Sequence, residues 1–259
     1  MAISFPHQPE IQFDHPPLEE VVCQVRIPPI LRISREEPID FQEQIRHRFP
    51  QLQWEDGVQV QLPVPGNPNA PSAEFKPRLF RFISSDEQTA VSLTVNFFAL
   101  STHHYTHWQA FAADLQLAHH AVQQVYQPAY ATRIGLRYIN RLTLANTHTQ
   151  DKAALFSLLR SELTAMLRGS VWQDAADMVC QLTFSDQTAQ LRFRIAYEEV
   201  ENAPTFLLDF DYFEEGKLPL AGLIERCDQY HAIIYNAFRW SLLDETIERF
   251  QSAQTMEGT

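Results

Sequence analysis

The sequence predicts an α+β fold in which a strand, helix, three strands and helix unit occurs twice. Three observations predict it. Apolar and polar residues alternate over several short stretches, which is typical of half-buried strands. Two long stretches, at about 106–127 and 220–239, instead carry apolar residues at helical spacing. The order of these elements also repeats at about half the chain length. We therefore expect a curved, mostly antiparallel sheet with the long helices packed on one face.

The first α+β half is expected to span residues 18–130, after an extended, proline-rich arm at 1–17. Its expected elements are a strand at 18–27, a short helix at 40–49, a weakly alternating stretch at 57–64, a proline-rich loop at 63–77, strands at 78–84 and 89–98, and a long helix. Thr106 and Gln109 have the spacing of a capping box, so we expect this helix to begin there. Pro128 should end it.

The second α+β half is expected at 131–259 and packs with the first as one globular unit. Its expected elements are strands at 133–142, 178–184, 189–197 and 205–212, and helices at 151–167, 220–239 and 242–250, with the 151–167 helix between the first two strands. Identity between the halves is low, so the duplication rests on element order alone. The plan resembles the TATA-binding-protein-like fold, which helix-grip ligand-binding domains also use. A fold resemblance does not carry function.

Arginines recur with a spacing of four in the central strand, at Arg133, Arg137 and Arg141. Side chains alternate along a strand, so these three share one face, while Tyr138 and Asn140 belong to the apolar face. Extending the alternation to the other strands predicts an open face with six candidate binding residues: Arg26, Arg81, Arg137, Arg141, Arg192 and Arg194.

This open face has three interpretations. Asp209 and Asp211 lie on the adjoining strand, where Asp209 should fall near Arg194 and Asp211 near Arg192, so the charges could pair on a solvated surface. The arginines could instead bind an anionic group, an oligonucleotide or an acidic partner. The third interpretation is the interface of a homodimer that covers the sheet.

Three stretches carry a resemblance to a known family. They are residues 16–22, the run Gly-Leu-Arg-Tyr-Ile-Asn-Arg at 135–141, and residues 230–238 with 243–244. On these, the chain resembles a sporadically distributed bacterial family of uncharacterised proteins of this size, over nearly its whole length. The resemblance implies a small prokaryotic protein that is non-essential and mobile between genomes. It implies no activity, cofactor or catalytic residue.

Composition limits the classes of partner. The formal net charge is −12, which disfavours the broad electrostatic binding that nucleic acids usually require. The sequence has no apolar run long enough to cross a membrane and no signal-peptide pattern at its start. The three cysteines, Cys23, Cys180 and Cys227, sit in apolar patterns and are expected to be reduced core residues. We therefore expect a cytoplasmic protein without a membrane partner.

No motif for catalysis or for a cofactor is present. His103, His104 and His107 invite comparison with a metal site, but they lack the spacing of the metalloprotease pattern, so we expect no metal. The sequence contains neither a Gly-x-Ser-x-Gly turn nor a phosphate-binding loop, and only 7 glycines. We therefore predict no catalytic residue and no cofactor.

Three functional hypotheses remain. The first is a non-enzymatic prokaryotic binding or accessory protein that uses the arginine face for an acidic partner or an anionic group. The second is a helix-grip-like domain, or an enzyme, with an apolar cavity between helices and sheet. An aromatic lining from Phe80, Phe82, Phe97, Phe193 and Phe210 would favour the second hypothesis. The third and weakest is a nucleic-acid binder, which must overcome the net charge.

Overall fold

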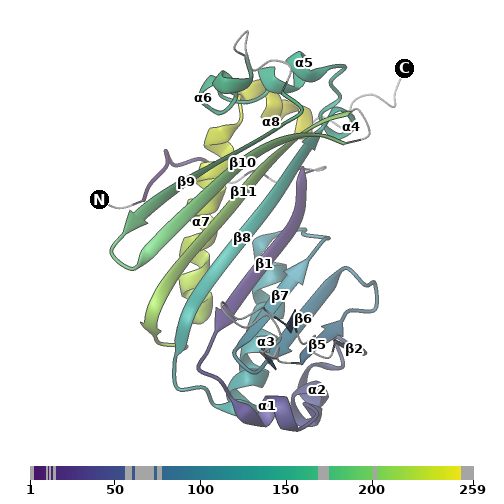
Figure 1. The fold of residues 1–259 in the computed structure, drawn as a ribbon, viewed down its shortest axis with the longest axis vertical. Coiled ribbons are helices and arrows are strands. Elements are labelled where there is room, and N and C mark those ends of the chain that lie inside the picture. Colours follow the sequence, from purple (N-terminus) through teal and green to yellow (C-terminus); the bar gives the residue numbers. More distant parts are fainter. Residues whose placement is uncertain are drawn as a thin grey trace.

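The computed structural model describes residues 3–9, 11, 13, 16–55, 60–61, 73–74, 78–168, 175–200 and 203–251. Over these residues, nine strands form one open antiparallel sheet in the order β2-β5-β6-β7-β1-β8-β11-β10-β9 (Figure 1). Two short strands, β3 and β4, pair separately. The predicted α+β class and the antiparallel sheet are therefore confirmed.

The strands are β1 (Leu18–Arg26), β2 (Gln51–Glu55), β3 (Val60–Gln61), β4 (Ala73–Glu74), β5 (Leu79–Ile83), β6 (Thr89–Thr94), β7 (Phe97–Thr102), β8 (Ala131–Thr143), β9 (Asp177–Asp186), β10 (Ala189–Val200) and β11 (Ala203–Leu218). The helices are α1 (Leu31–Arg35), α2 (Ile39–Ile45), α3 (Trp108–Tyr126), α4 (Leu144–Thr147), α5 (Lys152–Ser157), α6 (Ser161–Thr164), the 3-10 helix η1 (Ala165–Arg168), α7 (Leu223–Ser241) and α8 (Asp244–Gln251).

The strands β1 and β8 pair at the centre of the sheet, with Val22 opposite Arg137. Alternation decides which side chains each strand buries. In β1, Val21, Cys23 and Val25 are buried, while the residues between them face the other side. This is the pattern that half-buried strands require.

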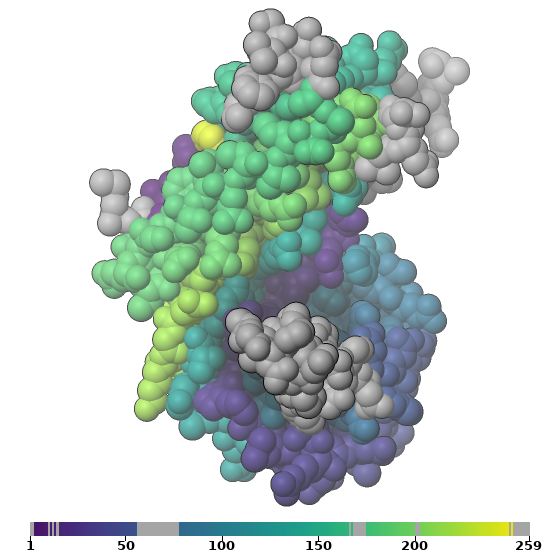
Figure 2. Space-filling view, viewed as in Figure 1, coloured from purple at the N-terminus to yellow at the C-terminus, as the bar shows by residue number. Residues whose placement is uncertain are grey.

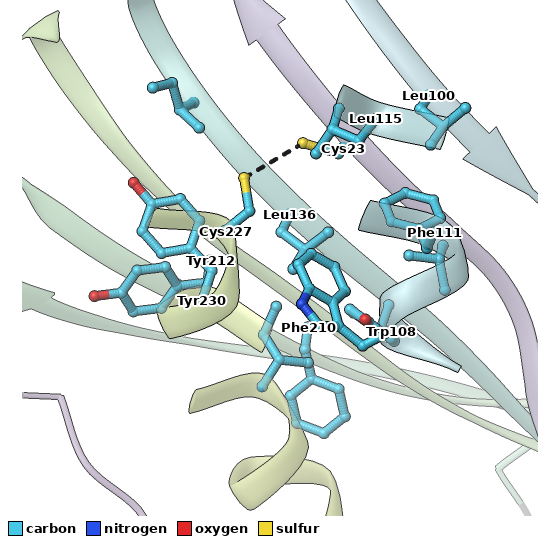
Figure 3. Close-up of a cluster of buried hydrophobic side chains, with 14 of the residues drawn as sticks. Cys23, Leu100, Trp108, Phe111, Leu115, Leu136, Phe210, Tyr212, Cys227 and Tyr230 are labelled. Atoms are coloured by element: carbon cyan, nitrogen blue, oxygen red, sulfur yellow. Dashed lines mark hydrogen bonds between the residues drawn. The ribbon is translucent and has the colours of Figure 1, made fainter. Parts of the chain in front are cut away.

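Both long helices contact strands of the sheet, and they contact each other. Helix α3 contacts β7 and α7, and α7 contacts β8 and β11. Between them lies a cluster of apolar side chains in which Cys23 on β1 meets Cys227 on α7 (Figure 3). Their sulfur atoms are 3.8 Å apart, and both thiols are free. None of the described helices is long and apolar enough to cross a membrane.

The structure corrects the expected strand at 89–98. A tight turn at Val95 and Asn96 divides this stretch into β6 and β7. The turn shifts the alternation, so Phe98 is buried and Phe97 lies opposite Arg26 on the other face of the sheet. The strand β2, at 51–55, was not predicted, because its residues are mostly polar and exposed.

Two helix predictions were also wrong in detail. The expected helix at 151–167 is broken into α5, α6 and η1, although Asp151 caps its start by accepting a hydrogen bond from the Ala154 N–H. Helix α3 is capped by His107 rather than by Thr106. The predictions for 57–64 and 63–77 lie mostly outside the described residues.

Candidate functional site

The six predicted arginines share one face of the sheet, opposite α3 and α7. Strand register places Arg26, Arg137 and Arg141 in the centre, Arg192 and Arg194 on β10, and Arg81 on β5. Figure 2 views the molecule from this side, with β9 and β10 in green in the upper half and β1 and β8 deeper between the two halves. Arg26, Arg192 and Arg194 are exposed, and the other three are half-buried.

The central arginines are engaged by carboxylates. Arg137 donates two hydrogen bonds to Asp209, each 2.7 Å long, and Arg133 donates to both oxygens of Asp211 at 2.9 Å. Asp209 is 5% exposed. The strand register does place Arg194 opposite Asp209 and Arg192 opposite Asp211, but the carboxylates bind arginines of β8 instead. Arg192 and Arg194 on β10 therefore form no ion pair with these two carboxylates.

Arg141 completes a line of ion pairs along β8. It donates to Glu19 at 2.8 Å and to Glu198 at 2.9 Å, which joins β1, β8 and β10. The hydrogen bond to Glu19 raises the pKa of Arg141, and the hydrogen bond to Asp209 raises that of Arg137. Both guanidinium groups are therefore charged and locally neutralised.

Within the described chain, four of the predicted arginines form no ion pair: Arg26, Arg81, Arg192 and Arg194. Arg26 donates to Gln24, and Arg192 lies over the ring of Phe213 at 4.6 Å. Arg133 covers the same ring at 4.3 Å, so Phe213 is enclosed by two guanidinium groups. The face is consequently a mixed-charge surface rather than a uniformly cationic one.

The opposite side of the sheet contains a cavity of about 350 Å³. Its walls come from the N-terminal arm, the start of α3, the middle of β8 and the second half of α7. The lining residues are Ile11, Phe13, Pro16, Leu18, Tyr105, Thr106, His107, Trp108, Gln109, Tyr138, Asn140, His231, Ile234, Tyr235 and Phe238. Hereafter these residues are called the helix-side pocket.

Several aromatic side chains of the helix-side pocket contact one another through hydrogen bonds and ring stacking. The Tyr138 hydroxyl is 2.9 Å from Nδ1 of His231 and donates a hydrogen bond of 3.3 Å to the hydroxyl of Tyr105. Trp108 stacks on His231, with ring centroids 4.8 Å apart and planes 6° apart, and its indole N–H donates to Asp228. Burial raises the pKa of Tyr138 well above its usual value, so its hydroxyl stays protonated.

Asn140 brings an amide into this largely apolar wall. It lies on β8 two residues after Tyr138 and is 3% exposed. One N–H of its amide donates to the Leu208 carbonyl at 3.3 Å. No hydrogen bond from the described residues reaches its Oδ1, which leaves an acceptor available at the edge of the cavity.

An apolar cavity between helices and sheet was one hypothesis from the sequence, but the residues of this lining were not identified, although their signal was present. The three stretches that carried the family resemblance all contribute to it: Pro16 and Leu18 from the first, Tyr138 and Asn140 from the second, and four residues of α7 from the third. None of the phenylalanines expected to line a cavity lines this pocket, although Phe193 lines a second pocket of about 430 Å³. Phe80, Phe82, Phe193 and Phe210 are buried core side chains outside this lining, and Phe97 lies on the other face.

The histidines near the start of α3 have structural contacts. His107 caps the helix by accepting a hydrogen bond from the Ala110 N–H, and Nδ1 of His103 is 3.2 Å from the Glu19 carbonyl oxygen. Among the described residues, no three histidine, cysteine or acidic side chains gather in a way that could hold a metal ion. A scan against protein-family models and a search of curated proteins find no match to this chain.

Proposed function

We propose that this protein binds a small, largely apolar molecule in the helix-side pocket. The observation that carries the proposal is a cavity of about 350 Å³ with an aromatic lining and a few convergent polar atoms. Binding sites for small molecules typically occupy about 300–1,000 Å³ and have this mixture of apolar walls and placed polar groups. The proposal corresponds to the helix-grip-like alternative and involves binding rather than catalysis.

The experiment compares two tryptophan substitutions on α3. Gln109 and Gln116 are both exposed and lie on the same helix, but only Gln109 lines the pocket. Gln109→Trp places a large ring at the pocket, whereas Gln116→Trp places the same ring outside it. We would screen a metabolite library for compounds that raise the melting temperature of the wild-type protein, because a ligand stabilises the state that it binds.

Compounds that bind the pocket should stabilise the wild-type protein and Gln116→Trp, but not Gln109→Trp. Mass spectrometry of the protein purified from its own host should also find a small molecule in the wild type and not in Gln109→Trp. A library without any stabilising compound, or compounds that stabilise all three proteins equally, would overturn the proposal.

The arginine face supports a second candidate function, the binding of an acidic partner. Arg192 and Arg194 lie two residues apart on β10, so their exposed side chains are on the same face of the sheet. Neither forms an ion pair with a carboxylate within the described chain. We propose that these two arginines, together with Arg26 and Arg81, are the ones on this face that bind an acidic partner. A second copy of the chain is one such partner. Light scattering of the wild type and of the double variant Arg192→Ala/Arg194→Ala tests this, because the variant should dissociate a dimer that uses the face.

We also propose that the chain is a duplicated unit of the TATA-binding-protein-like or helix-grip kind, with a curved sheet. The strand order supports this, because β1, β7, β6 and β5 on one side of the centre correspond to β8, β11, β10 and β9 on the other. A long helix follows the last strand of each set. The free thiols of Cys23 and Cys227 support a reducing, cytoplasmic location, which we likewise propose.

A further inference from the structure

The chemistry of the helix-side pocket restricts which ligand it can take. Asn140 is almost fully buried, yet it uses only one of its hydrogen-bonding groups within the described chain, the N–H that donates to the Leu208 carbonyl. Its second N–H and its Oδ1 remain. Oδ1 is not among the fully buried unpaired side-chain atoms of the described chain, so it is reachable from the cavity, where water or a ligand can satisfy it. A ligand that supplies both a donor and an acceptor would complete this amide.

The described lining of the pocket offers a ligand no carboxylate, ammonium or guanidinium group. None of its described lining residues is Asp, Glu, Lys or Arg. The Tyr138 hydroxyl is held protonated by its burial, so it acts as a neutral group. A carboxylate or phosphate on the ligand would lose its hydration without gaining a guanidinium or ammonium partner from the described lining, which is unfavourable. The ligand that fits is therefore uncharged.

The walls favour a flat molecule. Trp108 and His231 are stacked nearly parallel, and Tyr105, Tyr235 and Phe238 complete the aromatic lining. Aromatic faces prefer offset stacking or edge contacts with other rings, so a planar ring system gains more contact here than a branched chain of the same volume.

We propose that the ligand of the helix-side pocket is an uncharged planar ring compound that carries an N–H donor beside a carbonyl acceptor, as in a lactam or an aromatic carboxamide. Asn140 recognises this edge with its Oδ1 and its remaining N–H. An asparagine amide reads a donor and an acceptor in the same way when it binds the edge of adenine. This inference rests on the proposed function, since it names the ligand class of the same site.

The experiment uses two probes that differ by one methyl group. 2-Quinolinone presents an N–H beside a carbonyl on a flat bicyclic ring, and N-methyl-2-quinolinone lacks the N–H. Ligand-observed NMR titrations with the full chain should show that 2-quinolinone binds more tightly, by about tenfold or more, because the methylated probe leaves Oδ1 unpaired. Quinoline-2-carboxylate, which is flat but charged, should bind more weakly than either.

The variant Asn140→Leu tests the residue itself. Leucine has a similar size and suits the apolar face of β8, and it should abolish the preference for the N–H probe. Gln116→Leu, on the exposed surface of α3, is the control and should keep that preference. If Asn140→Leu fails to fold, the two probes still decide the question with the wild-type protein.

Equal binding of both quinolinones, tighter binding of the carboxylate, or no binding of 2-quinolinone up to its solubility limit would overturn this inference. A preference for the N–H probe that survives Asn140→Leu would overturn the role of Asn140. Each of these results is compatible with the outcome expected for the proposed function, in which compounds from the metabolite screen stabilise the wild type but not Gln109→Trp. Failure of the ligand class is thereby distinguished from failure of the proposed function.

Discussion

The guanidinium of Arg133 lies over Gly135, two residues further along β8. A Cβ placed on Gly135 would stand 2.8 Å from Cζ of Arg133 and 2.9 Å from its Nη2. From this position Arg133 covers the ring of Phe213 and reaches both oxygens of Asp211. Because Gly135 has no side chain, the guanidinium of Arg133 can lie over it and contact Phe213 and Asp211 on the neighbouring β11.

Gly135→Ala should consequently destabilise the protein by about 1–3 kcal/mol, because it displaces a nearly buried guanidinium from its ring and its carboxylate. Elsewhere in a strand interior, alanine is better than glycine by about 0.5–1 kcal/mol. The free energy of unfolding from urea titration measures the effect. In an Arg133→Ala background the same substitution should be neutral or stabilising, and an unchanged penalty there would disprove the steric explanation.

Arg137 and Arg194 offer a second comparison, because both lie beside Asp209 and only Arg137 binds it. Arg137→Ala leaves the buried Asp209 carboxylate without its partner and should cost about 1–3 kcal/mol of stability, less than for a fully buried pair because Arg137 is partly exposed. Arg194→Ala should change stability by less than about 0.5 kcal/mol. Equal melting temperatures for the two variants would mean that the ion pair contributes nothing.

The outcome for these arginines illustrates what alternation in a sequence can predict. The alternation of side chains along each strand places Arg26, Arg137 and Arg192 on one face, and the strand register agrees. Alternation does not specify which carboxylate each arginine binds, because that depends on side-chain direction along the strand. Asp209 and Asp211 both turn toward β8, where Gly135 leaves room for Arg133 to reach Asp211.

The residues that line the pocket were not predicted, for a different reason. Its lining comes from four segments that are far apart in the sequence, and a cavity is a gap in packing that no single segment encodes. Asn140 was the available clue, since a polar side chain on the apolar side of a strand needs a partner. The misplaced Phe97 has a local cause: the turn at Val95 and Asn96 interrupts an otherwise regular alternation.

Acid should weaken the fold through His119 on α3. Its ring is stacked on Phe98, its Nε2 is buried without a hydrogen-bond partner in the described structure, and this burial lowers its pKa from the usual 6.5. A folded-state pKa below that of the unfolded chain means that the unfolded state binds the proton first. Neutral His119 therefore contributes its full stabilisation above about pH 6.5, and this contribution declines as the pH falls below that value.

The variant His119→Phe should retain the stacking on Phe98 and lose less stability than the wild type between pH 7 and 5. One group contributes at most about 1.4 kcal/mol per pH unit. Urea titrations at several pH values measure the slope, and His47→Gln, at an exposed position, is the control. Parallel pH profiles for the wild type and His119→Phe would show that His119 is not the acid-sensitive group.

Tyr235 on α7 holds the N-terminal arm over the pocket. Its hydroxyl accepts a hydrogen bond of 2.8 Å from the Ile11 N–H and donates one of 3.0 Å to the Pro9 carbonyl. Arg239, which is 6% exposed, also donates to this hydroxyl at 3.3 Å. One oxygen therefore joins the arm, the helix and a buried charge, and Tyr235→Phe removes all three contacts without changing the shape of the ring.

We expect Tyr235→Phe to lower the free energy of unfolding by about 1–2 kcal/mol and to release the arm first. Chymotrypsin reports the release, because Phe13 on the arm becomes cleavable once it leaves its contacts with Phe238 and Phe250. N-terminal fragments in the mass spectrum should form faster than in Tyr130→Phe, whose hydroxyl forms no hydrogen bond within the described chain. If both variants lose the arm at the wild-type rate, the hydroxyl is not its tether, and the rings of Phe5 and Phe13 hold it alone.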